Sequence, residues 1–241
     1  MKFDIIRANQ RGHFNFGWLD THHTFSFGEY HNRERIHFGA LRVVNDDIIA
    51  PQSSFPLHPH QNMEIITLVL TGSVEHQDNL GNKTIICAGE IQTMCAGSGI
   101  LHSEANPSYN EELSLFQIWI HPHQRNLTPS YAQRNFSEQL AYIDQWQLLI
   151  SPDAHHDRLQ INQEAYLALG EFQNPDKVFN YTLHNPNHGV FIMVISGQLN
   201  LAEHILHNRD AIMLSDCTEV NFTVNHSTRL LLIEVPLTIT L

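Results

Sequence analysis

Short runs of apolar residues recur along the whole chain, and glycine, asparagine or aspartate bounds most of them. The run at residues 65–70 ends at Thr71-Gly72, and the run at 113–120 places Leu115, Gln117 and Trp119 on one face. Runs of this length with turn residues between them are typical of β-strands joined by tight turns. The pattern therefore predicts an all-β protein built as a sandwich or a barrel.

Two stretches nearer the N-terminus are less regular. Residues 25–27 (Phe-Ser-Phe) alternate and predict a strand with an aromatic face. Residues 45–47 (Asn-Asp-Asp) separate two apolar pieces. Asparagine and aspartate bond to their own backbone and tolerate left-handed conformations, so we expect a turn there.

The second half of the chain repeats the first half in a weakened form. The order and the approximate spacing of three matched segments agree, which predicts two β lobes. We expect a first domain at residues 1–134 and a second at 135–241, connected through a polar stretch with a helix start at Ser137. The matched segments are 68–72 with 193–197, 89–94 with 209–214, and 115–122 with 230–236.

The composition narrows the function classes. Hydrophobic residues make up 42% of the chain and charged residues 16%, and no apolar run approaches the roughly 18 residues of a membrane span. A net charge of −12 argues against direct nucleic-acid binding, because phosphate-binding surfaces concentrate lysine and arginine. We expect a soluble globular protein without a membrane or nucleic-acid partner.

The cysteines and the N-terminus indicate a cytoplasmic protein. The three cysteines form no Cys-x-x-Cys motif, and one stays unpaired whatever the others do, which fits a reducing compartment. Residues 1–4 (Met-Lys-Phe-Asp) begin no apolar signal segment.

Two polar pairs mark a candidate metal site. His58 and His60 lie two residues apart, as do His102 and Glu104, so each pair can share one face of a strand. In a chain with 18 histidines a single pair is weak evidence, and the second pair behind its own glycine turn makes the site credible. Three imidazoles and a carboxylate suit Fe, Cu, Ni, Mn or Zn better than the metals that thiols select.

Other histidines fit this chemistry less well. His22 and His23 are adjacent, so on a strand they point to opposite sides and cannot join one site. The second His-Pro-His, at 121–123, follows a strand and is interpreted as its exit loop. Counting along the repeat gives the second-lobe counterparts of the four site residues, none of which is a strong ligand: Leu183, Asn185, Phe222 and Val224.

These features resemble the pirin family of the cupin superfamily. The resemblance covers nearly all of residues 15–125 and is looser over 145–241. The segments that carry it are 17–19 (GWL), 23–28 (HTFSFG), 41–43 (LRV), 45–47 (NDD), 58–60 (HPH), 63–65 (MEI), 81–82 (GN), 88–92 (AGEIQ) with Met94, 96–100 (AGSGI), and 102–104 (HSE) with Asn106.

The resemblance implies a bicupin, in which the first lobe holds a metal and the second, degenerate lobe keeps the barrel without one. The implied ligands are His58, His60, His102 and Glu104. The metal would be one divalent transition ion per chain, iron first, with Cu, Ni, Mn, Co or Zn as alternatives. Many cupins outside this family use a glutamate shortly after His-x-His as a ligand, and Glu64 holds that place here. The resemblance gives Glu64 instead the task of orienting a histidine, or of an alternate base.

The resemblance also implies an activity. Bacterial pirin-like proteins are similar to quercetin 2,3-dioxygenases, which open a small aromatic, flavonol-like substrate with O2 and release carbon monoxide. Glu104 is then the candidate base for the substrate's 3-hydroxyl group. Animal pirins give the alternative, a metal- or redox-sensing binding protein that modulates a protein partner. A cupin isomerase is a third reading.

Overall fold

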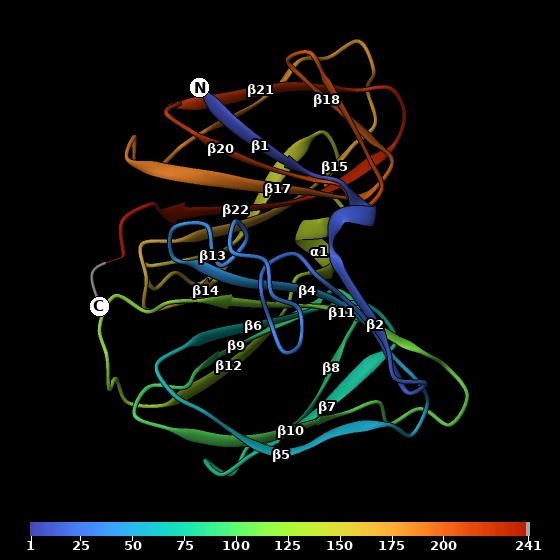
Figure 1. Cartoon of the computed structure of the whole chain (residues 1–241), viewed down its shortest axis with the longest axis vertical. Coiled ribbons are helices and arrows are strands. Elements are labelled where there is room, and N and C mark those ends of the chain that lie inside the picture. The colour runs from blue at the N-terminus through green and yellow to red at the C-terminus, as the bar shows by residue number, and fades with distance from the viewer. Residues whose placement is uncertain (240–241) are drawn as a thin grey trace.

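The computed structural model describes residues 1–239 and shows two β lobes, one above the other in Figure 1. Each lobe contains one seven-stranded and one four-stranded sheet, which confirms the predicted all-β fold. The first lobe's large sheet has the order β12 (Ser130–Asn135), β9 (Glu90–Cys95), β6 (Glu64–Thr71), β11 (Leu113–Ile120), β4 (Leu41–Ile49), β3 (Leu19–His23) and β2 (Gly12–Asn15), and its small sheet the order β5 (Ser54–His60), β10 (Ile100–Ala105), β7 (Ser73–Asp78) and β8 (Lys83–Cys87).

The second lobe has the same plan. Its large sheet has the order β1 (Lys2–Ile6), β20 (Ala211–Ser215), β17 (His188–Ser196), β22 (Thr228–Pro236), β15 (Tyr166–Phe172), β13 (Gln145–Ser151) and β14 (Leu159–Gln160), and its small sheet the order β16 (Phe179–Thr182), β21 (Glu219–Val224), β18 (Gln198–Leu201) and β19 (His204–His207). The helices of the described residues are the 3-10 turn η1 (Ala8–Gln10) and α1 (Ser137–Leu140), which begins at the expected residue. Over residues 1–239, no helix is both long and apolar enough to cross a bilayer.

The two lobes exchange their outermost strands. β1 precedes the first lobe but pairs with β20 of the second, and β12 precedes the second lobe but pairs with β9 of the first. Figure 1 shows the blue N-terminal strand lying against the orange and red strands of the upper lobe. The expected first domain of residues 1–134 is therefore wrong at its start, since residues 2–6 belong to the second lobe's sheet. Sequence order could not reveal this, because the pairing joins distant segments.

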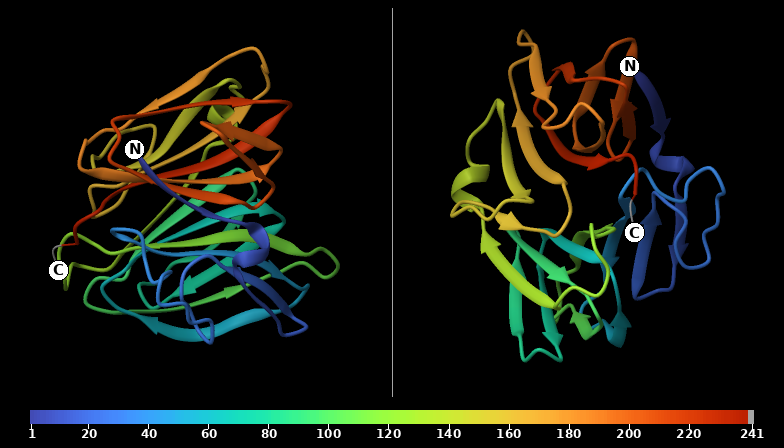
Figure 2. Two further views of the ribbon diagram at one scale, coloured as in Figure 1. Left: turned by 45° about the horizontal axis from the view of Figure 1, so that its top comes forward. Right: turned by 90° about the vertical axis from the view of Figure 1, so that its left-hand side faces the viewer.

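The two large sheets pack face to face in the middle of the molecule, and the small sheets lie on the outside, as both views of Figure 2 show. Along β6, Ile66 and Leu68 belong to one core cluster with Leu231 and Ile233 of the second lobe. Their neighbours on β6 point the other way, into the first lobe's interior, since strand side chains alternate. This alternation decides which residues can reach the candidate site.

The predictions of local structure at residues 25–27 and 45–47 are wrong. Residues 25–27 lie in the long connection between β3 and β4. Residues 45–47 form the middle of the continuous strand β4 and are buried there. Asp46 tolerates this burial because it accepts hydrogen bonds from Arg11, at 3.2 Å, and from Arg209 of the second lobe, at 2.9 Å. Those partners are distant in sequence, so the local pattern resembled a turn.

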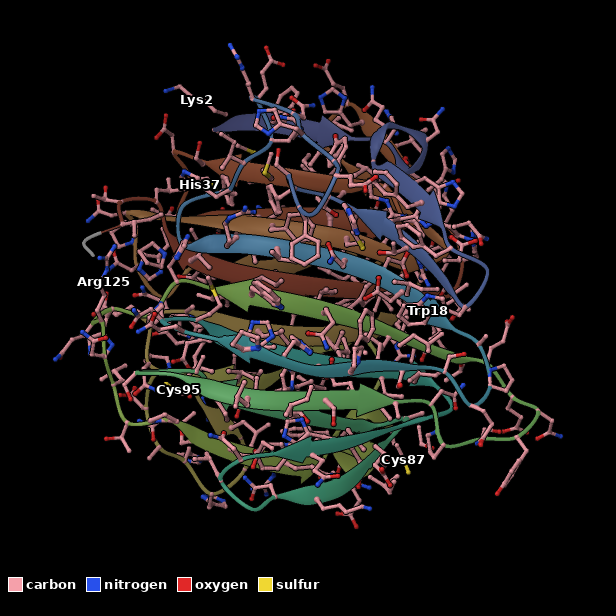
Figure 3. All side chains as sticks on the ribbon, turned by 60° about the horizontal axis from the view of Figure 1, so that its bottom comes forward. Lys2, Trp18, His37, Cys87, Cys95 and Arg125 are labelled. Atoms are coloured by element: carbon pink, nitrogen blue, oxygen red, sulfur yellow. The ribbon has the colours of Figure 1, made fainter. Side chains whose placement is uncertain are left out.

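All three cysteines are free thiols. Figure 3 shows Cys87 and Cys95 at separate places on the first lobe. Cys87 is exposed, whereas Cys95 is buried. Burial, with the carboxyl of Glu64 beside it, raises the pKa of the Cys95 thiol to about 12. The buried thiol therefore stays protonated and behaves as a small core residue.

Candidate metal centre

Three histidines meet on the inner face of the first lobe's small sheet. His58 and His60 lie on β5, and His102 lies opposite His58 on the neighbouring strand β10. Their ring centroids are 4.4 to 4.8 Å apart, and one nitrogen from each ring lies within 4.8 Å of the other two. The period of two along β5 and the antiparallel pairing with β10 are sufficient to bring them together.

Hydrogen bonds leave the correct nitrogens free for a metal. Nδ1 of His58 lies 2.7 Å from the carbonyl oxygen of Pro56, which only accepts, so this nitrogen carries the proton and Nε2 keeps its lone pair. Nε2 of His102 is buried and has no hydrogen-bond partner within residues 1–239. A buried nitrogen of this kind requires a ligand, and a divalent cation satisfies it.

Two of the three rings, those of His60 and His102, have lowered pKa values. Burial, together with the nearby His58, lowers the pKa of His60 to about 4. Burial and the surrounding histidines lower the pKa of His102 to about 2. Metal binding requires unprotonated imidazole, so these residues fit a divalent transition metal.

A hydrogen-bonded chain behind the site orients His102. Nε2 of His76, on β7, lies 3.0 Å from Oδ2 of Asp78 and donates to that carboxylate. Its Nδ1 is then an acceptor and faces Nδ1 of His102 at 3.5 Å. Burial would raise the pKa of Asp78, but hydrogen bonds from His76, Asn82 and Leu80 lower it below its usual value. An ionised Asp78 fixes His76, and His76 fixes the tautomer of His102.

Sequence reasoning missed His76 and Asp78. His76 is fully buried and stacks on Tyr131 of β12, with ring centroids 4.7 Å apart. The sequence signal was the i, i+2 spacing of His76 and Asp78 on one strand. Its meaning depends on the pairing of β7 with β10, which the sequence does not state.

Glu104 lies in the same pocket on β10 and is fully buried. Nε2 of Gln117 donates to both of its carboxyl oxygens, at 2.8 and 2.7 Å, and the hydroxyl of Thr67 donates at 3.2 Å. Burial raises the pKa of Glu104 to about 7. Oxygen and nitrogen atoms of Glu104, His102 and His76 form a second close group, so Glu104 lies next to the three-histidine cluster.

The structure does not bring Glu64 to the site. Glu64 lies on the face of β6 that turns toward the second lobe, where the backbone N–H and side-chain Nδ2 of Asn162 donate to its carboxylate at 3.3 and 3.2 Å. The strand parity that linked Glu64 to His60 fails because β5 ends at His60 and a turn with a positive φ at Asn62 follows. The expected role of Glu64 as an orienting group or alternate base is therefore wrong.

The site opens into a pocket of about 370 Å³. Phe27, Phe55 and Trp119 supply aromatic walls, and the Trp119 ring lies 4.9 Å from His60 and 5.2 Å from Phe27. This volume and this mixture of apolar walls with a few convergent polar groups are typical of small-molecule sites. Phe27 reaches the pocket from the connection that the sequence suggested was a strand.

The equivalent interior of the second lobe is largely apolar, with one buried carboxylate, Glu234, which accepts a hydrogen bond from the hydroxyl of Tyr181 at 2.8 Å and lies 2.9 Å from Nδ1 of His188. The buried apolar residues of this lobe form one continuous cluster across both sheets, whereas polar residues divide the first lobe's interior into two clusters. Strand pairing corrects the counted counterparts, because the loops of the two lobes differ in length. Aligned at Gly72 and Gly197, the counterparts of His58, His60, His102 and Glu104 are Tyr181, Leu183, Val220 and Phe222.

Comparisons with known proteins agree with this architecture. The Pirin family profile matches residues 6–120, and the profile of the quercetinase C-terminal cupin domain matches residues 148–235. A quercetin 2,3-dioxygenase of Escherichia coli K12 is 40% identical over 232 residues, which cover 96% of this chain and 98% of that protein. A pirin-like protein of Caulobacter vibrioides is 37% identical over 220 residues, covering 90% and 93% of the two chains.

A solved structure of a bacterial pirin has the same fold. The crystal structure of the bacterial pirin YhhW from Escherichia coli in complex with nickel(II) superposes with a TM-score of 0.91, at 39% identity, over 98% of this chain and 99% of that chain. Fold and site thus define a bicupin with its candidate metal centre in the N-terminal lobe. The chain belongs to the pirin family.

Proposed function

We propose that this protein is a metal-dependent dioxygenase that opens the ring of a flavonol such as quercetin with O2 and releases carbon monoxide. The observation that carries the proposal is the cluster of His58, His60 and His102 at the inner end of an aromatic pocket. The relatives named quercetin 2,3-dioxygenase support the same reaction.

The residues of the pocket have separate roles in the proposed reaction. His58, His60, His102 and Glu104 would hold one divalent metal, which when bound supplies Lewis-acid polarisation and orients the substrate oxygen. Glu104 accepts the proton of the 3-hydroxyl group, while Gln117 holds its carboxyl group in place. The aromatic walls pack against the flat substrate and exclude water from the reacting end.

The metal is proposed to be iron, with Cu, Ni, Mn, Co and Zn as alternatives that the same ligands accept. The nickel(II) complex of the related YhhW supports a divalent transition metal. We also propose a cytoplasmic location, which the three free thiols support.

Metal analysis and turnover in the same preparations test the proposal. Protein purified without an affinity tag is stripped, loaded with one metal at a time and mixed with quercetin in air. We expect loss of flavonol absorbance with at least one metal, and loss of both metal and turnover in His58→Ala and His102→Ala. Full metal content in both variants would falsify the ligand assignment, and His226→Ala, at an exposed histidine outside the candidate metal clusters, is the matched control.

A further inference from the structure

A row of polar side chains crosses the inner face of the first lobe's large sheet, opposite the histidines. Successive strand pairs place its members side by side: His23 opposite Asn45, Asn45 opposite Gln117, Gln117 opposite Thr67, and Thr67 opposite Gln92. We call these five residues the polar belt. Asp47 follows Asn45 on the same face of β4 and also lines the pocket.

The two ends of the polar belt differ in their hydrogen bonding. At one end, Gln117 donates to Glu104 and to Thr67, and Gln92 also donates to Thr67. At the other end, Oδ1 of Asn45 and Oδ1 of Asp47 are both buried and make no hydrogen bond within residues 1–239. Their cross-strand neighbours on β3, Nδ1 of His23 and the hydroxyl of Thr21, are buried without a hydrogen bond as well, so polar atoms without partners gather at this end. Oε1 of Gln92 also lacks a partner, but Gln92 is not part of the pocket lining.

Unpaired buried acceptors are costly, and native proteins usually satisfy them with a ligand or water. The amide oxygen of Asn45 only accepts, and the carboxyl of Asp47 accepts from any donor once it is ionised, so a ligand that pairs with both must donate. They lie on one strand, two residues apart, in a pocket whose remaining walls include Phe27, Phe55 and Trp119. A flat aromatic ring that bears hydroxyl groups satisfies the acceptors and the aromatic walls together.

We propose that Asn45 and Asp47 form an acceptor subsite that binds hydroxyl groups of a polyhydroxylated aromatic ligand, whose other oxygen lies toward His58, His60 and His102. The inference rests on the proposed function for the orientation of the ligand, and it adds a determinant of selectivity. A site with buried acceptors binds an analogue that lacks the hydroxyl more weakly, because the acceptors are then left unpaired. The expected discrimination is roughly tenfold to a hundredfold.

Binding without turnover tests the subsite. Zinc-loaded protein under nitrogen is titrated with quercetin and with 3-hydroxyflavone, which keeps the 3-hydroxyl and the ketone but carries no other hydroxyl. The dissociation constants come from the change in flavonol absorbance. We expect the parent to bind quercetin at least tenfold more tightly than 3-hydroxyflavone.

Variants of Asn45 and Asp47 test whether these two residues cause the preference for quercetin. Asn45→Leu and Asp47→Leu should each reduce the ratio of the two dissociation constants toward one, by weakening quercetin while 3-hydroxyflavone is unchanged. Asp20→Leu on the adjacent strand β3 is the matched control, because Asp20 hydrogen-bonds to His13 and Asn15 on the outer surface. It should keep the parent ratio. If a leucine variant fails to fold, Asn45→Asp is used in its place. It should retain the preference for quercetin, since it keeps an acceptor.

The outcomes separate this inference from the proposed function. A parent ratio near one, or an unchanged ratio in both leucine variants, overturns the subsite. If neither flavonol binds, the proposed flavonol substrate is wrong. The subsite is then tested by competition between 1,3,5-trihydroxybenzene and phenol for the protein, followed by NMR. A trihydroxybenzene preference that disappears in Asp47→Leu supports it, and equal binding of the two compounds overturns it.

Discussion

His102 owes its orientation to two residues that do not touch the pocket themselves. Asp78 holds His76, and His76 in turn accepts from Nδ1 of His102, so Nε2 of His102 points into the site. Metal-binding histidines commonly depend on such partners. His76 and Asp78 are positioning residues in this sense.

We therefore expect His76→Ala and Asp78→Asn to weaken metal binding by roughly 10- to 100-fold while the fold is kept. Competition with a chelator of known affinity gives the metal dissociation constants. The difference should be in affinity for the metal, with turnover per bound metal close to that of the parent. Parental affinity in both variants would show that the chain does not orient His102.

Glu104 and Glu64 form a matched pair, because both are buried glutamates of the first lobe and only Glu104 lies in the pocket. Glu104→Gln keeps the size of the side chain and one acceptor oxygen but removes the basic carboxylate, so turnover of quercetin should fall by about 10²–10⁴ with most of the metal retained. Glu64→Gln should leave turnover near the parental rate, because Glu64 faces Asn162.

Steady-state rates at equal metal content decide between the two residues. An undiminished rate in Glu104→Gln removes it as the base. A larger loss in Glu64→Gln than in Glu104→Gln would reverse the assignment made from the orientation of β6.

Ionisation of Asp47 makes the stability of the protein depend on pH. Burial raises its pKa from 3.8 to about 7. Between these values the folded state binds more protons at this residue than the unfolded state, so its contribution to the free energy of unfolding falls as pH rises. Asp47→Asn removes this dependence.

The free energy of unfolding of metal-free Asp47→Asn minus that of the parent should therefore be larger at pH 8 than at pH 4.5, by roughly 1 to 4 kcal/mol. Urea unfolding at both pH values gives the difference, and the comparison with the parent cancels the contribution of the other titrating groups. A difference that is the same at both pH values contradicts the burial argument.

At the scale of elements, the sequence predicted strands wherever an apolar run and a turn signal occurred together. The segment 65–70 became part of β6, and His58 and His60 share a face of β5 as their spacing predicted. The pairing of β5 with β10, which joins both ligand pairs, was a condition of the predicted site and did not follow from the pattern, because β6 to β9 separate the two strands in sequence.

The prediction failed where a distant contact determines the conformation. Residues 45–47 are strand because Asp46 binds Arg209, far along the chain, and because Asn45 and Asp47 face the pocket. Glu64 turned away because the turn at Asn62 interrupts the strand alternation. The Asp78 and His76 chain needed the register of β7 against β10. The contact of Asp46 with Arg209 and the register of β7 against β10 have no local signature in the sequence.

At the scale of the whole molecule, the exchanged strands couple the lobes. Five residue pairs join β1 to β20, and Ile6 of β1 belongs to the core between the lobes. Removing residues 2–6 exposes the edge of β20 and should lower the stability of the second lobe by roughly 2 to 4 kcal/mol, from lost hydrogen bonds and apolar burial.

Hydrogen exchange measures this effect with an internal control. Amides of β20 should exchange faster in the shortened protein, whereas those of β9, which keeps its partner β12, should stay protected. Unchanged exchange in β20, or an equal loss of protection in both strands, would contradict the account of the exchanged strands.

Cleavage of a flavonol with O2 at the metal centre of the first lobe is the proposed reaction. The most direct measurement is carbon monoxide in the headspace over metal-loaded protein and quercetin in air, compared with the amount of quercetin consumed. The account predicts one carbon monoxide per quercetin for the parent and none for His102→Ala. Metal-loaded parent that consumes no quercetin and releases no carbon monoxide would contradict it.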